Sequence, residues 1–409
     1  MGCVGARRSL VPLGRKRVNG ERLTLRIEDV GYGGEGVARV GAQPGCAQGA
    51  PVVFVPGAFA GEVVEAEIVQ RKARFARARL LRVLSPSPDR IEPEAPPVPG
   101  MPYAALAYPA EVAIKARQLQ TLLERLGRFE AAPFLKAAVP SPVHAHYRNK
   151  LTLHWDGRRL GYIGEDNRTV IDTPACPLSQ AAVNDALARL RGERARLRSV
   201  RPGGRVIFRY TPADGVRVGL GKPPTGELTE RVAGLELRVA ADAFFQVNLA
   251  AAERLLAAFM QALADNPPRR VFDLYCGCGL FGLAAARAGA RELFGLETTP
   301  SAVRSAEANA RRLGVVATYR CAPAEALPGA LPAADLWVVD PPRDGLSEAV
   351  RAHLLRALPP RVAYVSCAPD TLARDLRALS AHYRPRSVQL FDFFPRTAHF
   401  ETLSLLERC

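Results

Sequence analysis

The chain lacks long hydrophobic runs and regularly spaced cysteines. Nowhere do about eighteen apolar residues follow one another, which argues against a membrane-spanning helix. Residues 1–13 contain arginines but no apolar core of a signal peptide. The eight cysteines are scattered, without the paired spacing of a disulfide framework or a zinc site. We therefore expect a soluble, cytoplasmic protein with no membrane contact and no bound metal.

Acidic residues are also in short supply. The sequence has 56 Lys and Arg against 40 Asp and Glu, which gives a net charge of +16 and a pI near 9.9. Such an excess favours a polyanionic partner, nucleic acid first, although a generally basic proteome gives the same composition. At 409 residues the chain is long enough for two or three domains. Its oligomeric state is left open.

Short segments of alternating apolar and polar residues dominate the N-terminal part. They predict strands at 23–27, 36–40, 51–55 and 62–69, and thus a small antiparallel β-barrel of the OB kind over residues 17–84. Its last strand is basic and includes an aromatic ring. The residues concerned are Arg71, Lys72, Arg74, Phe75, Arg77, Arg79 and Arg82. This strand is typical of an RNA-binding groove, or of a charged edge that resists aggregation.

A proline-rich linker is predicted over 85–107, followed by a central α+β RNA-binding domain over 108–240. The pattern in this domain indicates helices at about 108–128 and 180–198. Strands are expected from 147–153 onward and at 205–210 and 215–220. Arg148 and Lys150 either contact phosphate or form a solvated pair of charges.

Residues 241–409 alternate regularly between strands and helices. The predicted strands are 271–275, 292–297, 335–340 and 361–367, and the helices between them are 280–288, 300–313 and 347–358. This order indicates a doubly wound, Rossmann-like α/β sheet, whose ligands bind beyond the carboxyl ends of the strands.

A glycine turn at 276–279 follows the first of these strands, and Glu297 ends the second, where a ribose diol would need an acceptor. The turn departs from the dinucleotide fingerprint, and the domain has no lysine-bearing phosphate loop. The ligand expected here is a nucleoside without a pyrophosphate, and S-adenosylmethionine fits that description.

Cys367 and Glu401 are the strongest candidates for chemistry. Cys367 closes a hydrophobic strand at the start of a helix marked by Pro369, and Glu401 interrupts the apolar run from Phe400 to Leu406. A helix N-terminus lowers the pKa of a thiol, so we expect Cys367 to act as a nucleophile. A carboxylate brought near it can remove a proton.

Five motifs stand in order along the chain, and together they resemble those of the RNA (uracil-5)-methyltransferase family. They are Phe244-Phe245-Gln246-Val247-Asn248, the segment from Asp273 to Gly279, Asp340-Pro341-Pro342-Arg343, Ser366-Cys367 and His399-Phe400-Glu401. The likeness extends over nearly the whole chain, and the N-terminal barrel is similar to a TRAM domain. It implies a class I methyltransferase domain that transfers a methyl group from S-adenosylmethionine to C5 of a uridine in structured RNA. The TRAM-like domain favours 23S ribosomal RNA over transfer RNA as substrate.

The resemblance also assigns roles to residues. It implies that Cys367 adds to C6 of the uracil and that Glu401 removes the C5 proton. The residues implied to contact S-adenosylmethionine are Gln246, Tyr275, Glu297 and Asp340. A hydrogen bond from Asp340 to the uracil ring is a further hypothesis.

Two departures from the family pattern have consequences. Many TRAM-bearing members hold an iron-sulfur cluster with three cysteines before the central domain and a fourth within it. Residues 92–102 contain no cysteine here, and Cys176 alone cannot hold a cluster that needs about four thiolates, so none is expected. Ala368 stands where the family usually has asparagine, which bears on local orientation or substrate preference.

Two rival functions remain open. Another class I RNA methyltransferase, acting on cytosine C5 or an exocyclic amine, would need the cofactor sheet but not Glu401 in this context. A non-catalytic RNA-binding relative would keep the basic barrel but would have no need for intact Cys367 and Glu401.

Overall fold

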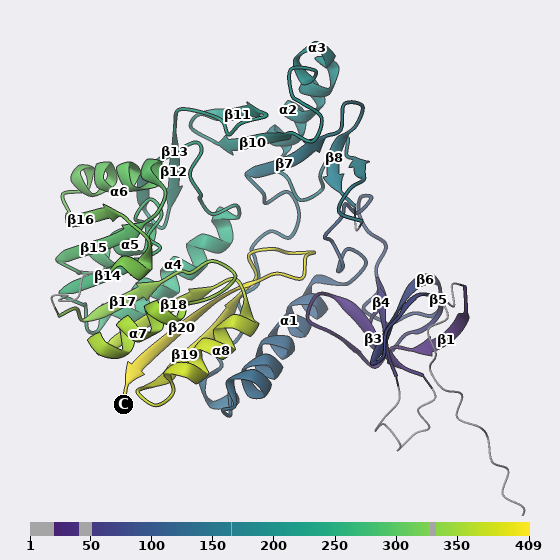
Figure 1. Ribbon diagram of the computed structural model, residues 1–409, viewed down its shortest axis with the longest axis horizontal. Coiled ribbons are helices and arrows are strands. Elements are labelled where there is room, and N and C mark those ends of the chain that lie inside the picture. Colours follow the sequence, from purple (N-terminus) through teal and green to yellow (C-terminus); the bar gives the residue numbers. More distant parts are fainter. Residues whose placement is uncertain (1–19, 41–50, 165, 328–332) are drawn as a thin grey trace, which may run out of the picture. The chain divides into compact units, whose positions relative to one another are not determined.

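The computed structural model describes residues 20–40, 51–164, 166–327 and 333–409, which form two compact units (Figure 1). The first unit extends to Glu92 and includes Ala105–Ala107, and the second comprises Pro93–Ala104 and Tyr108–Cys409. Within these described ranges, no helix has both the length and the apolar character that crossing a membrane requires.

The first unit is a six-stranded sheet with the order β1-β5-β6-β4-β3-β2. Its strands are β1 (Arg22–Arg26), β2 (Asp29–Val30), β3 (Glu35–Arg39), β4 (Val52–Pro56), β5 (Val63–Arg71) and β6 (Phe75–Ser85). Alternate residues such as Leu25, Ala38 and Val53 point into one apolar core, as the period-2 pattern predicts. Neighbouring strands are antiparallel except β4 and β6, which are parallel. A Cβ at Gly36 would lie 2.6 Å from the Ala58 carbonyl oxygen, so only glycine fits this crossing.

The arginines of β6 face acidic partners elsewhere in the same sheet. The Nη2 atoms of Arg77 and Arg82 lie 3.2 and 3.3 Å from Oε2 of Glu35 and Glu65. Arg79 of β6 pairs with Glu67, and Arg71, the last residue of β5, pairs with Glu21. Exposed pairs of this kind stabilise a fold by only about 0–1 kcal/mol, but they neutralise charge. The basic strand predicted to bind RNA is therefore largely compensated within its own sheet.

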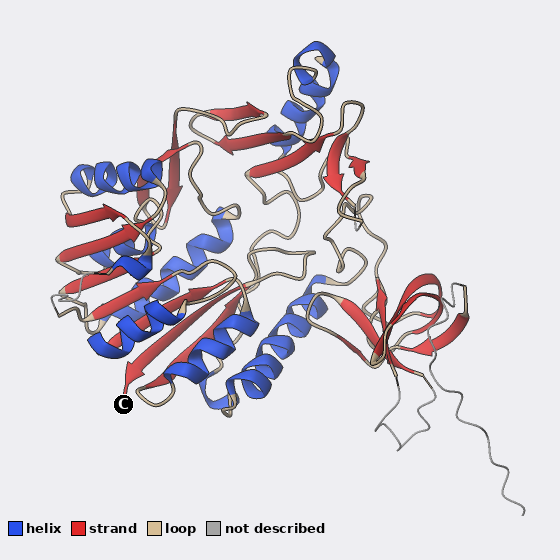
Figure 2. Ribbon diagram, in the orientation of Figure 1, coloured by secondary structure: helices blue, strands red, loops and turns tan. Residues whose placement is uncertain are grey.

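The central part of the second unit contains a five-stranded antiparallel sheet with the order β11-β10-β7-β8-β9 (Figure 2). Its elements are β7 (Lys150–Trp155), β8 (Leu160–Ile163), β9 (Val170–Asp172), α2 (Ala181–Gly192), α3 (Arg194–Leu197), β10 (Arg205–Thr211) and β11 (Gly215–Leu220). One helix over 180–198 was expected, and this prediction is wrong. The helix ends at Gly192, because glycine has a low helix propensity, and Glu193 leaves the helical conformation with ψ 59°.

The C-terminal part confirms the doubly wound α/β prediction. Its seven-stranded sheet has the order β16-β15-β14-β17-β18-β20-β19. The strands are β14 (Arg270–Leu274), β15 (Glu292–Glu297), β16 (Val316–Cys321), β17 (Leu336–Val339), β18 (Arg361–Ser366), β19 (Tyr383–Phe391) and β20 (Glu401–Arg408). The first five in spatial order are parallel, whereas β20 runs antiparallel to both of its neighbours. This reversal brings the start of β20 to the carboxyl edge of the parallel strands.

Helices cover both faces of this sheet (Figure 1). They are α1 (Tyr108–Leu122, continued by a π-helical turn, η1, at Leu123–Gly127), α4 (Leu249–Ala264), α5 (Leu280–Arg287), α6 (Pro300–Arg312), α7 (Glu348–Ala357) and α8 (Pro369–Leu379). One core packs α4, α5 and α6 against residues such as Val271, and the other packs α1, α7 and α8 against residues such as Phe272. A separate hairpin pairs β12 (Glu227–Val232) with β13 (Leu235–Ala240).

A fully buried lysine ties α1 to the segment between β19 and β20. The Lys115 Nζ lies 2.7 Å from Oε1 of Glu111 and 2.8 Å from Oδ1 of Asp392, and it donates to the Phe394 carbonyl oxygen at 3.2 Å. All three charged side chains are completely enclosed. This network fixes the backbone that leads into Glu401.

Replacing this lysine should be strongly destabilising. We expect Lys115→Met to lower the free energy of unfolding by about 3–5 kcal/mol, because it removes the cation of buried Asp392 and leaves buried Glu111 with only the Arg396 guanidinium at 3.7 Å. Urea unfolding monitored by circular dichroism measures the change. Lys136→Met removes an exposed lysine and serves as the control. A loss below about 1 kcal/mol, as at an exposed pair, would contradict the account.

Candidate active site

Four predicted residues lie just at or beyond the carboxyl ends of adjacent parallel strands. Glu297 ends β15, Tyr275 follows β14, Asp340 follows β17, and Cys367 comes one residue after β18. The carboxyl ends of β14, β15 and β17 lie in register with one another, because Leu274 pairs with both Leu296 and Val339. The expectation that these residues share one edge of the sheet is therefore met by the strand register.

Glu401 reaches the same edge by a route that periodicity did not indicate. We expected it to interrupt the apolar run from Phe400 to Leu406, and in the structure it is the first residue of β20. Ser366 is paired with Thr402 across the antiparallel β18–β20 ladder, so the next residues outward on the two strands are Cys367 and Glu401. The Thr402 hydroxyl donates to the Ser366 carbonyl oxygen at 3.2 Å and fixes this register. The thiol and the carboxyl group thus start from adjoining backbone positions.

The backbone after Cys367 turns directly into helix α8. Ala368 is the N-cap residue and Pro369 the first helical residue. The cap has no side-chain acceptor, and the Ser366 hydroxyl instead accepts from the Ala368 N–H and donates to the Ala368 carbonyl oxygen, both at 3.1 Å. A side chain with an oxygen at position 368, such as asparagine, would supply the helix cap that this chain lacks.

Cys367 has a raised pKa, not the lowered one expected from the helix N-terminus. Burial raises the pKa of the thiol to about 11, and the nearby Glu401 and Asp340 add to the effect, while Arg343 opposes it. A helix end offers only about half a unit charge, which does not offset desolvation together with two carboxyl groups. At neutral pH the free protein therefore holds Cys367 mainly as the thiol.

Alkylation of the free protein tests whether burial outweighs the helix end in setting the pKa of Cys367. We expect the iodoacetamide reaction rate of Cys367 to rise about tenfold per pH unit between pH 7 and 10, because only the thiolate reacts and its fraction grows until the pKa near 11 is reached. Peptide mass spectrometry separates Cys367 from the exposed Cys321 and Cys409. A rate that levels off below pH 8.5 would show that the helix end dominates after all.

The carboxyl groups beside the thiol also favour their protonated forms. Burial raises the pKa of Glu401 well above its usual value, and Asp340 raises it further, whereas Arg343 lowers it. Burial alone raises the pKa of Asp340 to about 7. A carboxylate with a high pKa is a strong proton acceptor, which is what proton removal from carbon requires. Arg343 was quoted in the sequence motif but given no role, although its charge acts on both Cys367 and Glu401.

His399 lies two residues before Glu401, and burial together with the positive charge of Arg343 and other cations lowers its pKa to about 4. The imidazole is therefore neutral at physiological pH. Its ring stands edge-on to Phe394, with centroids 6.4 Å apart.

The turn after β14 has the features of a nucleoside site. Tyr275 has a positive φ of 64°, and Gly277 and Gly279 also lie in the left-handed region. Added to Gly277, a Cβ would meet no atom within 4 Å, whereas at Gly279 it would come within 2.9 Å of the Tyr319 hydroxyl. Side chains therefore pack against the turn at Gly279, whereas the space beside Gly277 is open, and a ligand can approach the backbone there.

Two carboxyl groups frame this turn. Glu297 accepts from the Gly277 N–H at 3.2 Å and from the Thr299 N–H at 2.7 Å, so its orientation is set by backbone. Asp273 accepts from the Gly282 N–H at 2.8 Å with one oxygen, while its Oδ1 is buried without a partner among the described residues. Burial raises the pKa of Asp273 to about 7. An unsatisfied buried oxygen beside an open glycine turn fits a site completed by a polar ligand.

Gln246 belongs to a different segment of the second unit, just before α4. It is buried, and its carbonyl oxygen accepts from the Asn149 side chain at 3.1 Å. The following Asn248 caps α4 and donates to the Phe393 carbonyl oxygen at 3.0 Å, linking this motif to the segment before Glu401. Among the described residues, no hydrogen bond joins the Gln246 side chain to the other five predicted site residues.

Cys176 has surroundings unlike those of a cluster ligand. It is fully buried, with its Sγ 3.3 Å from the Tyr162 hydroxyl oxygen. It lines a cavity of about 300 Å³ with prolines, His146 and Asn184, and no second cysteine is among the lining residues. Within the described ranges, no group of three or more His, Cys, Asp or Glu side chains is placed to hold a metal ion. These donors do not fit an iron-sulfur cluster, and its absence stays a prediction.

Three family models match parts of this chain. A family model described as tRNA (uracil-5-)-methyltransferase matches residues 333–409, and the TRAM domain model matches 16–81. A model of ribosomal protein L11 methyltransferase matches 251–336. An uncharacterized RNA methyltransferase of Thermosynechococcus vestitus is 31% identical, with 95% of this chain and 98% of the relative covered. The chain belongs to the RNA (uracil-5)-methyltransferase family.

Further similarities support this membership. An uncharacterized RNA methyltransferase of Bdellovibrio bacteriovorus is 30% identical, with 95% of each chain covered. The crystal structure of Pyrococcus abyssi tRNA (uracil-54, C5)-methyltransferase in complex with S-adenosyl-L-homocysteine superposes with a TM-score of 0.73. It covers 94% of this chain and all of that one, and at 22% identity it shows a shared fold. As a member of this family, the chain is an S-adenosylmethionine-dependent RNA methyltransferase.

Proposed function

We propose that this methyltransferase modifies C5 of a uridine in structured RNA, with Cys367 as the nucleophile and Glu401 as the base. The observation that carries the proposal is the pairing of β18 with β20, which starts both side chains from adjoining positions at the cofactor edge of the sheet. An exocyclic-amine methyltransferase has no need for a thiol and a buried carboxyl group side by side at that position, whereas a cytosine C5 methyltransferase also has to remove a C5 proton and is distinguished by the nucleoside that it modifies. A non-catalytic relative has no need to bury one at all, because burial without a partner is costly.

The reaction follows from these two groups. The Cys367 thiolate adds to C6 of the uracil, and the electron pair of the C5–C6 double bond moves toward C5 and the C4 oxygen. C5 then takes the methyl group that S-adenosylmethionine supplies when bound. The Glu401 carboxylate removes the proton left on C5, the double bond re-forms, and the C6–sulfur bond breaks to release the thiolate.

The remaining candidates hold the cofactor and the base. We assign Glu297 to the ribose hydroxyls, since its carboxylate is fixed at the open glycine turn. Tyr275 and Asp340 lie between Glu297 and Cys367 on the sheet edge, and Gln246 contributes from the segment before α4. Asp340 acts on both Cys367 and Glu401 electrostatically, which supports a second role at the uracil ring.

A uridine stacked in a helix is inaccessible to this thiol, so the target flips out or comes from a loop. The TRAM domain leads us to favour 23S ribosomal RNA. Transfer RNA, the substrate in the name of the Pyrococcus abyssi protein, is the alternative.

The test is nucleoside analysis of cellular RNA with and without this protein. We expect one 5-methyluridine to disappear from 23S ribosomal RNA in its absence and to be restored by purified protein with S-adenosylmethionine. Loss of 5-methylcytidine or of an N-methylated base would replace the proposed reaction with one of its rivals. Loss from transfer RNA alone would keep the chemistry and change the substrate.

A further inference from the structure

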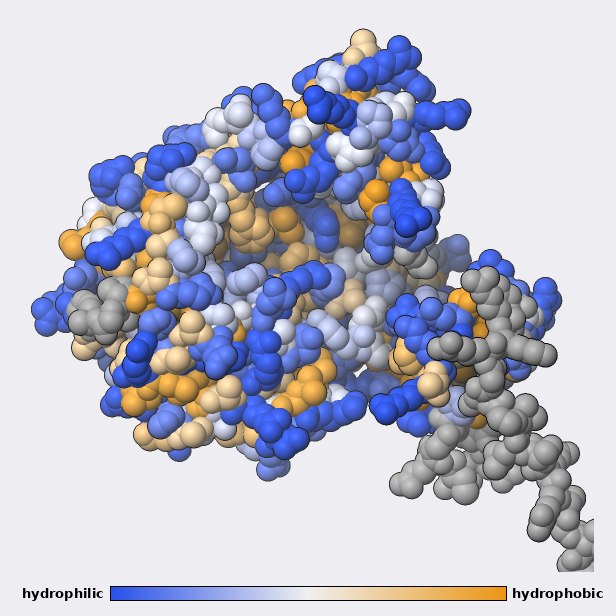
Figure 3. Space-filling model, viewed as in Figure 1, coloured by the Kyte–Doolittle hydropathy of each residue, from blue (hydrophilic) through white to orange (hydrophobic). Residues whose placement is uncertain are grey.

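The charge excess of this chain is concentrated in the central part of the second unit. Residues 189–222 contain ten Lys and Arg against two Asp and Glu. The described residues of the first unit up to Glu92 are nearly balanced, with ten Lys and Arg against nine Asp and Glu. The basic strand β6 is largely paired, as described above. Among the described residues, the electrostatic attraction for a polyanion therefore arises mainly from the surface around α2 and α3, where Figure 3 shows hydrophilic residues at the upper edge.

One cavity on this surface is lined by cations without any carboxylate. It has a volume of about 680 Å³ and lies between the turn that joins β7 to β8 and the region of α3. Its charged lining residues are Arg158, Arg159, Arg194 and Arg198. Only Arg159 has an ion pair, with Asp156 at 3.0 Å; within the described ranges the other three guanidinium groups have none.

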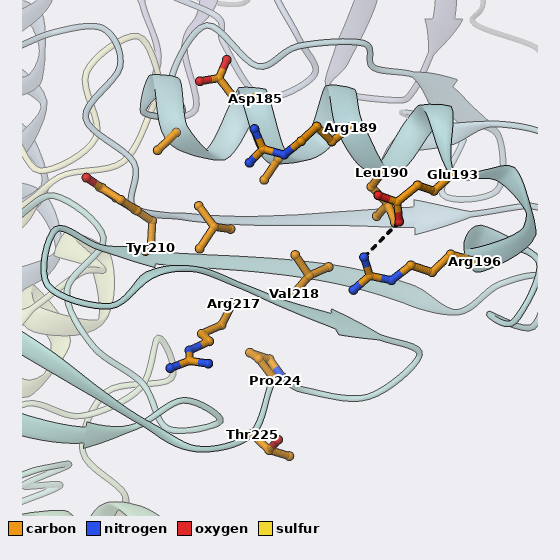
Figure 4. A pocket seen from close by; sticks show the side chains of 14 residues that line it. Asp185, Arg189, Leu190, Glu193, Arg196, Tyr210, Arg217, Val218, Pro224 and Thr225 are labelled. Atoms are coloured by element: carbon orange, nitrogen blue, oxygen red, sulfur yellow. Dashed lines mark hydrogen bonds and ion pairs between the residues drawn. The ribbon is translucent and has the colours of Figure 1, made fainter.

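A second cavity of about 680 Å³ lies between α2 and β11 (Figure 4). Arg189 on the helix and Arg217 on the strand line it, and neither forms an ion pair within the part of the chain that the structure describes. Arg196 also lines it but is paired with Glu193 at 3.0 Å, and Asp185 adds a further negative charge. Its charge is therefore more balanced than that of the first cavity.

Unpaired arginines converging on a concave surface are suited to phosphate. The guanidinium group offers a planar fork of donors that matches phosphate oxygens, and several such groups release counterions when a nucleic acid backbone binds. The alternative, an ordinary solvated surface, does not require three unpaired arginines from two separate chain segments to share one cavity.

We propose that the cavity lined by Arg158, Arg194 and Arg198 binds backbone phosphates of the RNA substrate, and that this site contributes more to RNA affinity than strand β6 of the TRAM domain. The inference rests on RNA being the substrate, and not on the chemistry assigned to Cys367 and Glu401. Binding measured without cofactor therefore tests it separately from the proposed reaction.

The experiment compares two triple variants of the full chain. Fluorescence anisotropy with a fluorescein-labelled RNA hairpin gives the dissociation constant at several salt concentrations. For R158Q/R194Q/R198Q we expect the plot of log K against log salt to become less steep, with the magnitude of its negative slope reduced by about 2–3. Affinity near physiological salt should fall by about ten- to a hundredfold. For R77Q/R79Q/R82Q, which removes paired arginines of β6, we expect a slope change below about 1.

Two controls separate lost binding from lost folding. The charge-preserving R158K/R194K/R198K variant should retain the wild-type salt slope, and thermal unfolding should show that all three variants are folded. An unchanged slope in the folded R158Q/R194Q/R198Q protein would overturn the proposal. So would a larger loss in the β6 variant, which would return the main RNA contact to the TRAM domain.

Discussion

Glu401→Gln should trap the enzyme on its product. Cys367 can still add to C6 and C5 can still accept a methyl group, but an amide does not take the C5 proton, so the C6–sulfur bond cannot break by elimination. We expect methylated RNA to remain covalently attached to the protein and turnover to fall by about 10²–10⁴-fold. Denaturing gel electrophoresis with labelled RNA measures the attached fraction.

Glu407→Gln provides the matched control, since this residue lies on the same strand but is paired with the exposed Arg386. It should turn over normally and release its RNA. Ordinary turnover by Glu401→Gln would remove the assigned base. Loss of activity without any attached RNA would place Glu401 in an earlier step.

Cys367→Ala should abolish methylation, because uracil C5 is too weak a nucleophile to take a methyl group unless a thiolate has added to C6. We expect a loss of about 10⁴-fold or more in turnover, with S-adenosylhomocysteine binding retained, since the cofactor residues lie on neighbouring strands. Tritium transfer from labelled S-adenosylmethionine to RNA measures the turnover, and calorimetry measures the binding.

The exposed Cys321 supplies the control for this variant, because Cys321→Ala removes a thiol that ends the edge strand β16, with three strands between it and β18. It should methylate RNA like the unmodified protein. Residual methylation by Cys367→Ala above about a hundredth of the normal rate would mean that the ring is activated by another group.

The sheet edge was predictable because parallel strands separated by helices align their carboxyl ends. Asp340 and Glu297 could be placed there from alternation alone. Glu401 could not, since its strand is antiparallel and enters the edge at its beginning, a fact that depends on long-range pairing with β18. The likeness to a known family supplied its role before the structure supplied its position.

The pKa values and the charge balance of these residues were less predictable from the sequence than their positions in the fold. The pKa of Cys367 rises because burial and two neighbouring carboxyl groups outweigh the helix end, and none of these is visible as local sequence. The sequence predicted that the arginines of β6 line an RNA-binding groove, but glutamates on other strands of the sheet neutralise their charge. Conversely, Arg158 and Arg194 are far apart in sequence and become one cationic cavity only through the fold.

The most direct test of the account is to locate the covalent bond between protein and RNA. Wild-type protein is incubated with S-adenosylmethionine and substrate RNA containing 5-fluorouridine, whose fluorine cannot be removed by a base. Digestion and mass spectrometry should then identify a methylated fluorouridine attached to the Cys367 peptide in equimolar yield. A methylated product with no attached peptide, or attachment to any other cysteine, would contradict the account.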